Sequence, residues 1–329
     1  MANRRRIASG RSRLLASRRP GGAAARRRRR ERPAPPPRPD PSPARRFASL
    51  RGAGSRRGWG AAGRAGDRRP RAGHRVSGRL EGKVAAISGS SRGIGLAVAR
   101  AFAAEGAKVV VNSRHAAVAS EVAGELGGQS VGVGADVTTE AGASALVDGA
   151  LSAFGKLDVF VNNAGIVHAG PTLDMSLAEW NRVIKLNMTA VFLCSRQAAR
   201  AMSRVGGGVI INTASVQAFA PFPRRLAYGS SKAAVVMMTR IMAAEWAPAV
   251  RVNAVAPGYV RTEMTARLEA EGRLDLKAVS GRTPQGRIAE PDEVAGAYVY
   301  LASSEAAFVT GETVVVDGGW LAFGAYAGI

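Results

Sequence analysis

Three side chains in the second half of the chain have the types and spacing needed to move a proton to or from an oxygen atom. Tyr228 and Lys232 are four residues apart, so on a helix they share one face. A phenol with a pKa of about 10 is a poor base, and a neighbouring ammonium is expected to lower that value towards the working range. Ser215 lies thirteen residues before Tyr228 and can donate a hydrogen bond to a carbonyl oxygen that gains negative charge.

A glycine-rich segment lies far upstream of these residues. Gly89, Gly93 and Gly95 follow the apolar run 84–87 and precede a helical pattern. Glycine lets the backbone turn tightly and approach a pyrophosphate, and the helix N-terminus supplies N–H groups. This placement predicts a dinucleotide site. The alternative is a tight strand-to-helix connection that binds nothing.

The residues after the second expected strand indicate which dinucleotide binds. An acidic residue there would bind the ribose 2′-hydroxyl of NAD. The segment 110–114 contains no acid and ends in Arg114, and Arg92 lies in the glycine turn. Guanidinium groups suit a 2′-phosphate, so the sequence predicts NADP(H) rather than NAD(H). The alternative is that both are ordinary surface arginines.

Apolar runs alternate with helical patterns from residue 80 onward. Such runs, without polar alternation, are typical of parallel strands buried on both faces, and the alternation predicts a doubly wound (Rossmann-like) parallel sheet flanked by helices in one α/β domain, residues 79–329. The expected strands are 84–87, 108–111, 130–134, 157–161, 209–212, 251–255 and 313–316, and the expected helices include 94–105, 144–154, 176–202 and 228–247.

The net charge of +23 is concentrated in one region. Residues 1–80 contain 25 arginines, no lysine and three acids, whereas the remainder has 22 basic and 21 acidic residues. The charge therefore says little about the substrate of the folded part. Residues 1–78 are rich in Arg, Pro, Ala and Gly, which predicts a disordered extension.

Three interpretations of this extension remain open. The first is that the segment is not in the native protein. Arginine without lysine suggests translation of a GC-rich reading frame, and Val76 would then mark the true start codon. A transit peptide comes second and would place the protein in an organelle. A nucleic-acid-binding tail comes third. Without a signal peptide or an apolar run long enough for a membrane span, the expected location is the cytoplasm.

The motifs taken together resemble the short-chain dehydrogenase/reductase family, in its single-domain branch. The resemblance covers residues 80–320 and rests on motifs in the family's order, namely Ser88-Gly89-x-x-x-Gly93-Ile94-Gly95, Asn162-Asn163-Ala164-Gly165, Asn187, Ser215, Tyr228-x-x-x-Lys232 and Pro257-Gly258. Ser88 stands where threonine is more usual and keeps the hydroxyl. The arginine-rich extension has no counterpart in this branch.

The resemblance implies a role for each matching residue. Tyr228 would be the general acid/base, Lys232 would lower its pKa and hold the nicotinamide ribose, Ser215 would polarise the carbonyl, and Asn187 would hold a water of the proton relay. The residues implied to bind the cofactor are Ser88, Gly89, Ser91, Arg92, Gly93, Ile94, Gly95, Ser113, Arg114, Asp136, Val137, Asn163, Ala164, Gly165, Tyr228, Lys232, Pro257, Gly258, Val260 and Thr262. No metal is expected, because the chain has one cysteine, Cys194, and no ligand cluster.

The expected function is hydride transfer between the nicotinamide and a ketone or secondary alcohol of a small molecule. Reductases of 3-oxoacyl-carrier-protein type and sugar or polyol dehydrogenases are the alternatives within the family. A dinucleotide-binding sensor with a nucleic-acid-binding tail is the alternative of another class, although a sensor would not need the catalytic set. Substrate choice is expected in the loops 166–175, 216–225 and 263–281.

Details of those loops lead to further expectations. Phe219, Pro221 and Phe222 predict an apolar wall, and residues 263–281 a mobile helical lid. Arg224 and Arg225 suit either an anionic substrate or plain solvated surface. The resemblance implies a homotetramer whose interface is formed by helices 176–202 and 228–247, with the aromatic C-terminal segment 319–326 available to pack on a neighbouring subunit.

Overall fold

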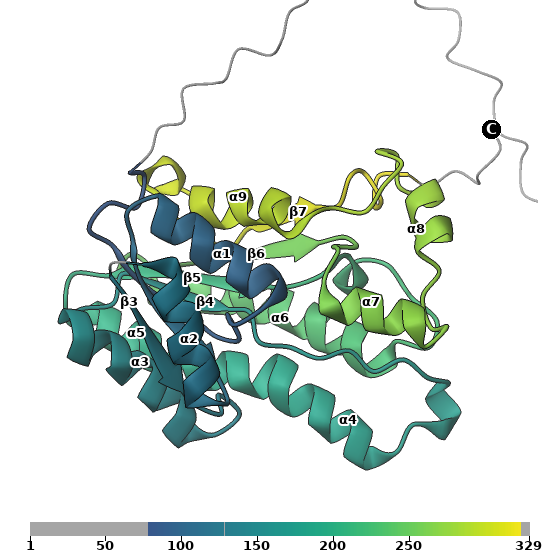
Figure 1. Cartoon of the computed structure of the whole chain (residues 1–329), viewed down its shortest axis with the longest axis horizontal. Coiled ribbons are helices and arrows are strands. Elements are labelled where there is room, and N and C mark those ends of the chain that lie inside the picture. Colours follow the sequence, from purple (N-terminus) through teal and green to yellow (C-terminus); the bar gives the residue numbers. More distant parts are fainter. Residues whose placement is uncertain (1–77, 128, 324–329) are drawn as a thin grey trace, which may run out of the picture. The chain divides into compact units, whose positions relative to one another are not determined.

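Seven parallel strands form one sheet in the computed structural model, which describes residues 78–127 and 129–323 (Figure 1). Their order across the sheet is β3-β2-β1-β4-β5-β6-β7. The predicted doubly wound α/β fold is therefore confirmed. The strands are β1 (Val84–Ile87), β2 (Lys108–Ser113), β3 (Ser130–Gly134), β4 (Val159–Asn162), β5 (Gly208–Thr213), β6 (Val250–Pro257) and β7 (Thr313–Val316).

The order of the strands determines where a ligand can bind. The chain moves outward from β1 to β2 and β3, then returns so that β4 pairs with β1 on its other side. The connections after β1 and β4 therefore leave the sheet in opposite directions, and a crevice opens at the carboxyl ends of these strands. Every residue of β1 and β4 is buried, as predicted from their apolar sequences. The prediction fails for β3 and β7, which are partly exposed because each lies at an edge of the sheet.

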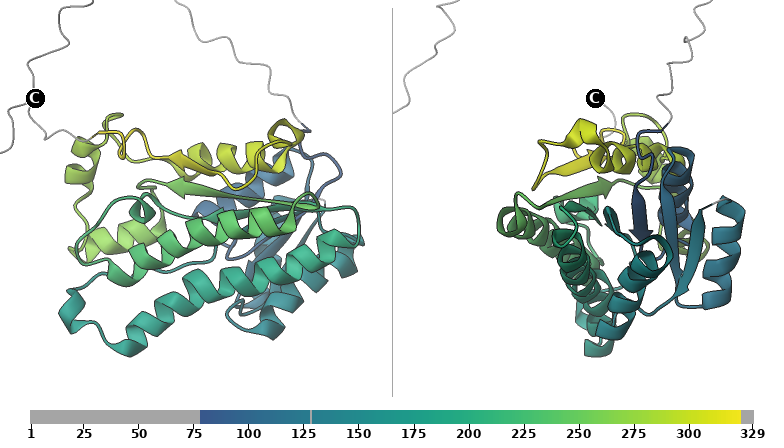
Figure 2. Two further views of the ribbon diagram at one scale, coloured as in Figure 1. Left: turned by 180° about the vertical axis from the view of Figure 1, so that it is seen from behind. Right: turned by 90° about the vertical axis from the view of Figure 1, so that its left-hand side faces the viewer.

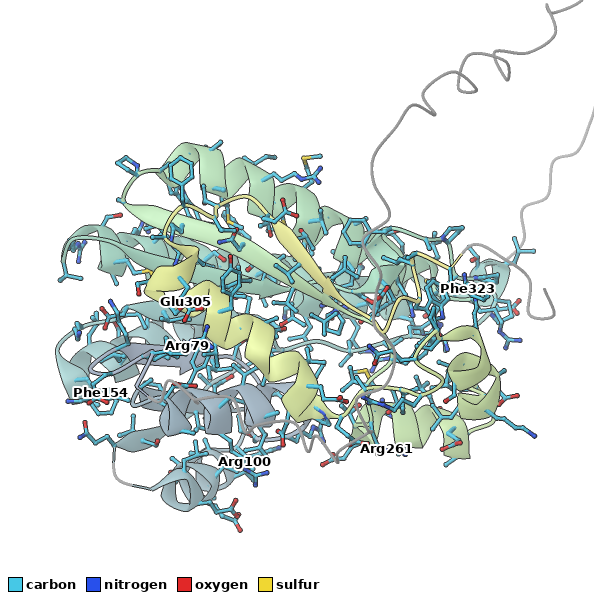
Figure 3. The ribbon with its side chains drawn as sticks, turned by 90° about the horizontal axis from the view of Figure 1, so that it is seen from above. Arg79, Arg100, Phe154, Arg261, Glu305 and Phe323 are labelled. Atoms are coloured by element: carbon cyan, nitrogen blue, oxygen red, sulfur yellow. The ribbon has the colours of Figure 1, made fainter. Side chains whose placement is uncertain are left out.

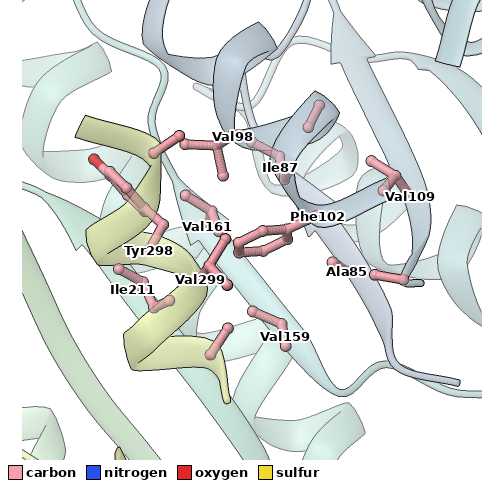
Figure 4. Packing of buried hydrophobic residues seen from close by; sticks show 14 of the residues in the cluster. Ala85, Ile87, Val98, Phe102, Val109, Val159, Val161, Ile211, Tyr298 and Val299 are labelled. Atoms are coloured by element: carbon pink, nitrogen blue, oxygen red, sulfur yellow. The ribbon is translucent and has the colours of Figure 1, made fainter. Parts of the chain in front are cut away.

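Helices cover both faces of the sheet (Figure 2). One apolar cluster joins the sheet to α1, α2 and α9, and a second joins its other face to α3, α5 and α6. In the first cluster, Phe102 of α1 and Tyr298 of α9 are both fully buried (Figure 4). The helices are α1 (Gly93–Ala104), α2 (Ala116–Leu126), α3 (Glu140–Phe154), α4 (Leu177–Ile184), α5 (Ala190–Ser203), α6 (Leu226–Trp246), α7 (Glu263–Ala270), α8 (Leu276–Arg282) and α9 (Pro291–Ala302).

One predicted helix is interrupted. The segment 176–202 was expected to be continuous, but a π-helical turn, η2 (Lys185–Thr189), separates α4 from α5. Such turns occur frequently at functional sites, because the extra residue re-aims the side chains around it. Asn187, one of the predicted catalytic residues, lies in this turn and is buried.

The start of the described chain is bound to the short helical turn that follows α9, η4 (Ser304–Ala306). The Arg79 guanidinium donates hydrogen bonds of 2.9 and 2.7 Å to the two carboxylate oxygens of Glu305 (Figure 3). The predicted disordered extension lies outside the described residues, except for Gly78, its last residue. Among the helices of the described segments, none is long and apolar enough to cross a membrane.

Candidate active site

The glycine turn after β1 has the conformation that its sequence predicts. Gly89 and Gly93 adopt φ angles of 61° and 55°, a region that favours glycine. Buried Asn112, at the end of β2, fixes the turn, because its Oδ1 accepts a hydrogen bond of 3.0 Å from the Gly89 amide. Its Nδ2 donates to the carbonyls of Ser113, Val133 and Ala135. No role was predicted for Asn112, although it directly follows the apolar residues of β2.

The third glycine of the turn allows a close approach of backbone segments. A Cβ atom on Gly95 would lie 2.5 Å from the Gly89 carbonyl oxygen and would also collide with the Asn163 amide. Helix α1 starts here with no acidic residue in its first turn and no side-chain cap. A glycine cradle beside uncapped N–H groups and the positive end of a helix dipole fits a pyrophosphate.

Two residues predicted to contact the cofactor use their side chains to hold this turn. The Ser88 hydroxyl accepts hydrogen bonds of 3.0 and 3.1 Å from the Asn163 and Ala164 amides. The Asn163 side chain donates to the carbonyls of Ser88 and Gly89. The β1 turn and the segment after β4, which includes Gly165, are thereby joined across the crevice.

The residues predicted for the adenosine end are mostly at the surface. Arg114 is exposed just after β2, and Ser113 is half-buried beside it. Hydrogen bonds from the Thr138 amide and hydroxyl lower the pKa of Asp136, with smaller effects from Lys185 and Arg114. Val137 is buried next to it. β2 and β3 are paired so that Ser113 lies opposite Gly134, and the residues that follow the two strands are therefore close together.

Arg92 lies in the glycine turn but does not extend towards Arg114. Its guanidinium lies 3.2 Å from a carboxylate oxygen of Glu263, the first residue of α7. Both side chains are about 70% exposed, so this pair is screened and weak. The prediction that Arg92 reaches the 2′-phosphate position therefore requires this pair to open.

The predicted serine and tyrosine line one open cleft at the carboxyl edge of the sheet. Ser215 follows β5, and Tyr228 lies in the first turn of α6. Predicted cofactor residues from the glycine turn and from the segment after β6 line the same cleft, namely Ile94, Pro257, Gly258, Val260 and Thr262. Four distant segments of the sequence thus contribute to one site.

Lys232 lies one helical turn after Tyr228 in α6 and is not among the residues that line this cleft. It is 4% exposed, and its ammonium donates a hydrogen bond of 2.6 Å to the Thr213 carbonyl. The ammonium nitrogen is 5.7 Å from the centre of the Tyr228 ring. Burial lowers the pKa of Lys232 to about 8.

The role predicted for Lys232 towards Tyr228 stays a prediction. Burial raises the pKa of the phenol, while hydrogen bonding with Ser215 opposes the rise. The Lys232 ammonium donates its hydrogen bond to the Thr213 carbonyl in this structure. Tyr228 therefore keeps its proton at neutral pH.

Asn187 joins the catalytic helix to the segment after β4. Its side chain accepts a hydrogen bond from the Ile166 amide and donates to the Ile166 carbonyl, both at 2.9 Å. It also donates to the Ser231 hydroxyl at 3.1 Å. A Cβ atom on Gly165 would lie 3.3 Å from Asn187 Oδ1 and 3.7 Å from Lys232 Nζ, so these two side chains converge at Gly165.

The wall of the cleft differs from the prediction. Phe219, Pro221 and Phe222 do not line it; Phe222 instead stacks on Trp320 at a centroid distance of 4.8 Å. Trp320 is buried there, so this part of the aromatic C-terminal segment packs within its own chain. The apolar wall comes from Val167, Met264 and Leu268, with Tyr259, Gln217 and Arg225 as further lining residues.

Sequence reasoning missed Tyr259 and Gln217, although each lies beside a recognised motif residue. Tyr259 follows Gly258, and Gln217 comes two residues after Ser215. Gln217 Oε1 is buried and has no hydrogen-bond partner among the described residues. The predicted helical lid is two short helices, α7 and α8, separated by a turn at Gly272, and α7 contributes Met264 and Leu268 to the cleft.

The remaining candidates are outside the cleft. His168 Nδ1 lies 3.6 Å from a carboxylate oxygen of Glu179. Burial raises the pKa of the Cys194 thiol to about 12, which suits a packing residue rather than a nucleophile. In the part of the chain that the structure describes, no group of three or more His, Cys, Asp or Glu residues could hold a metal ion.

Comparison with known proteins agrees with this geometry. The model of the family described as Enoyl-(Acyl carrier protein) reductase matches residues 89–321. The chain belongs to the short-chain dehydrogenase/reductase family, and it is an oxidoreductase that acts on CH–OH groups.

Its relatives differ in substrate. A 3beta-hydroxysteroid dehydrogenase 1 of Eggerthella lenta is 42% identical over 247 residues, which cover 73% of this chain and 94% of the relative. An NADP-dependent (R)-specific alcohol dehydrogenase of Lentilactobacillus kefiri is 41% identical over 250 residues, or 74% and 98%. The crystal structure of a gluconate 5-dehydrogenase from Burkholderia cenocepacia in complex with NADP and tartrate has 36% identity and a TM-score of 0.71, over 74% of this chain and 97% of that one.

Proposed function

We propose that this chain is an NADP(H)-dependent dehydrogenase that transfers a hydride between the nicotinamide and a ketone or secondary alcohol of a small molecule. One observation carries the proposal. Ser215 and Tyr228 line the same cleft as the glycine-turn residue Ile94, and the Lys232 ammonium is 5.7 Å from the centre of the Tyr228 ring. A substrate oxygen between the serine and the tyrosine would thus be next to a dinucleotide held by the glycine turn.

The protein's own groups would handle the proton and the developing charge. Bound NADP(H) supplies the hydride for reduction and, when oxidised, accepts one. In reduction, the Ser215 hydroxyl donates a hydrogen bond to the carbonyl oxygen, and Tyr228, whose pKa is raised by burial, donates its proton to that oxygen. Lys232, with a pKa of about 8, is still charged at neutral pH and stabilises the phenolate that remains.

The tyrosine would regain its proton through buried polar groups behind it. Asn187 and Lys232 converge at Gly165, and Asn187 is hydrogen-bonded to the Ile166 backbone. A water held there could pass a proton from solvent to the lysine and on to the phenol. The interruption of the helix at η2 directs Asn187 towards this place, which gives a reason for the π-helical turn.

The proposed preference for NADP(H) rests on Arg114. The segment after β2 has no acidic residue, and the exposed Arg114 stands where a 2′-phosphate would need a cation. Two relatives support the choice, since one is named NADP-dependent and another was solved with NADP. The glycine turn, Ser113, Asp136, Val137 and the segment 257–262 would hold the rest of the cofactor.

We further propose a homotetramer located in the cytoplasm. Helices α5 and α6, which the family resemblance assigns to the subunit interface, expose Phe192, Met237 and Ile241 to between 47 and 52%. Apolar side chains on neighbouring helices are typical of a surface that becomes buried on association.

The test of the proposed reaction is a panel of ketones and alcohols with NADPH and NADP⁺, run on the wild type and on Tyr228→Phe. The variant should fold and bind NADPH as the wild type does, but its turnover should fall by about 10²- to 10⁴-fold, because the ring packs alike and the proton donor is gone. Near-normal turnover by the variant would show that another group donates the proton.

A further inference from the structure

One charged side chain lines the catalytic cleft. Among the described residues that form its wall, Arg225 is the only Asp, Glu, Lys or Arg, and the others are apolar, hydroxyl-bearing, amide or backbone groups. Arg225 comes immediately before α6 and three residues before Tyr228, and it is half-buried. A cation in this position is next to the substrate rather than on a freely solvated face.

Hydrogen bonds hold Arg225 in place. Its Nη2 donates to the Arg273 carbonyl at 3.1 Å, and its Nη1 lies 3.4 Å from the Arg224 carbonyl. The guanidinium of Arg273 in turn donates to the Ala169 carbonyl, and the Gly170 amide donates to the Arg224 carbonyl. These bonds link all three loops in which the sequence predicted substrate selection.

The backbone beside Arg225 is in an unusual conformation. Arg224 has a φ of 65°, and it is the only non-glycine residue of the described chain with a positive φ. Such strain persists where the surrounding structure imposes it, and it is common at functional sites. Here it directs the chain so that the Arg225 side chain faces the cleft, while Arg224 itself is exposed and does not line it.

The charge of Arg225 has no carboxylate partner in the described part of the chain. No Asp or Glu oxygen of those residues is within 4.0 Å of it, whereas Arg273 is paired with Glu271 at 3.0 Å. Burial lowers the pKa of Arg225, and the positive charges of Arg273 and Arg224 act in the same direction. The guanidinium nevertheless stays protonated and has five N–H donors, of which these two contacts use two.

We infer that Arg225 binds a carboxylate of the substrate, so that the enzyme prefers hydroxy and oxo acids to neutral alcohols and ketones. This inference rests on the proposed function. The substrate oxygen lies between Ser215 and Tyr228, and the carboxylate lies towards the N-terminus of α6, whose helix dipole adds to the attraction. The apolar carbon skeleton packs against Val167, Met264 and Leu268.

Binding to the NADP⁺-loaded full-length protein tests the inference without turnover. The probes are cyclohexanecarboxylate and its neutral carboxamide, compared by titration calorimetry. The carboxylate should bind at least about tenfold more tightly, and Arg225→Gln should remove that preference, because a charge-assisted hydrogen bond is lost. Arg225→Lys keeps the charge and should retain part of the preference. The matched control Arg224→Gln should leave it within about twofold.

Turnover provides the second measurement. The ratio of kcat/KM for 4-oxocyclohexanecarboxylate to that for 4-oxocyclohexanecarboxamide should fall at least about tenfold in Arg225→Gln, mainly through KM for the acid. If the carboxylate binds no better than the amide, or if Arg224→Gln and Arg225→Gln behave alike, the inference is wrong even though neutral ketones are reduced. Loss of all ketone reduction in the wild type, with the carboxylate preference in binding intact, would instead contradict the proposed function.

Discussion

The catalytic and adenosine ends of the proposed cofactor site are built in opposite ways. At the catalytic end, Asn187, Ser215 and Lys232 are at most 6% exposed, and each makes hydrogen bonds to backbone or to neighbouring side chains. At the adenosine end, Arg92 and Arg114 are exposed. Buried groups with fixed partners hold one geometry, whereas exposed cations act through a screened charge.

This difference separates rate from selectivity. A change at the buried end should alter turnover most, because the buried groups there hold the geometry of the reacting atoms. A change at the exposed end should alter the choice of cofactor with little effect on folding. Asn112 lies between the two ends, since it fixes the glycine turn through Gly89 and pairs with the end of β3.

The largest effect should come from the buried end. Lys232→Met removes the ammonium below Tyr228 while keeping an unbranched side chain of similar length, so turnover should fall by about 10²- to 10⁴-fold. The fold should persist, because removing a buried charge that lacks an ionic partner costs little or stabilises. Steady-state kinetics and thermal unfolding measure the two effects, with Lys277→Met on α8 as the matched surface control. A variant that turns over normally would contradict the role of the lysine.

The next effect concerns the exposed end. Arg114→Asp should weaken NADPH strongly and NADH much less, shifting the ratio of their kcat/KM values by about tenfold or more, because a carboxylate repels a 2′-phosphate and accepts from a 2′-hydroxyl. Arg204→Asp, at the other end of the strands, controls for the change in net charge. Equal changes in kcat/KM for NADPH and NADH would show that Arg114 does not contact the ribose. The exposed end would then not determine the choice of cofactor.

Sequence patterns predicted the fold because each strand contains a short run rich in valine, isoleucine or alanine, or alternates valine with small residues. The segments 84–87, 130–134 and 313–316 match the observed strands at both ends. The helix expected at 176–202 was wrong in its middle, where η2 interrupts it. A π-helical turn inserts one residue into the helix, and the resulting shift of the apolar face was not recognised in the sequence.

The positions of site residues were predictable where a motif fixes the backbone conformation. They were less predictable where a side chain has several possible hydrogen-bonding or packing partners. The glycine turn and the Ser215–Tyr228 pair follow from local conformation and strand order. Lys232, by contrast, binds the Thr213 carbonyl, and Phe222 stacks on Trp320 rather than lining the cleft. Arg224 and Arg225 are adjacent residues of the same type, so the sequence does not indicate which of them lines the cleft. The positive φ of Arg224 directs the side chain of Arg225 into it.

The smallest expected effect is a pH dependence of stability that arises at the buried end alone. Burial lowers the pKa of Lys232 from 10.5 to about 8 in the folded protein. Between these values the unfolded chain binds more protons than the folded one, so the free energy of unfolding should rise with pH. The slope should be at most about 1.4 kcal/mol per pH unit. Burial also raises the pKa of Cys194, to about 12, and that of Tyr228, and these groups act in the opposite sense above about pH 9 and about pH 10, which limits the window to about pH 8–9.

Urea unfolding of the cofactor-free wild type and of Lys232→Met, at several pH values across that window, isolates this contribution. The stability of the wild type relative to the variant should increase as the pH rises, because the variant has no ammonium whose burial is relieved by losing its proton. The Arg114→Asp protein should follow the wild-type curve, since an exposed side chain that does not titrate in this range adds no slope. Parallel curves for the wild type and Lys232→Met would mean that the buried ammonium is compensated in the folded state. The contrast between a buried catalytic end and an exposed adenosine end would then rest on the kinetic measurements alone.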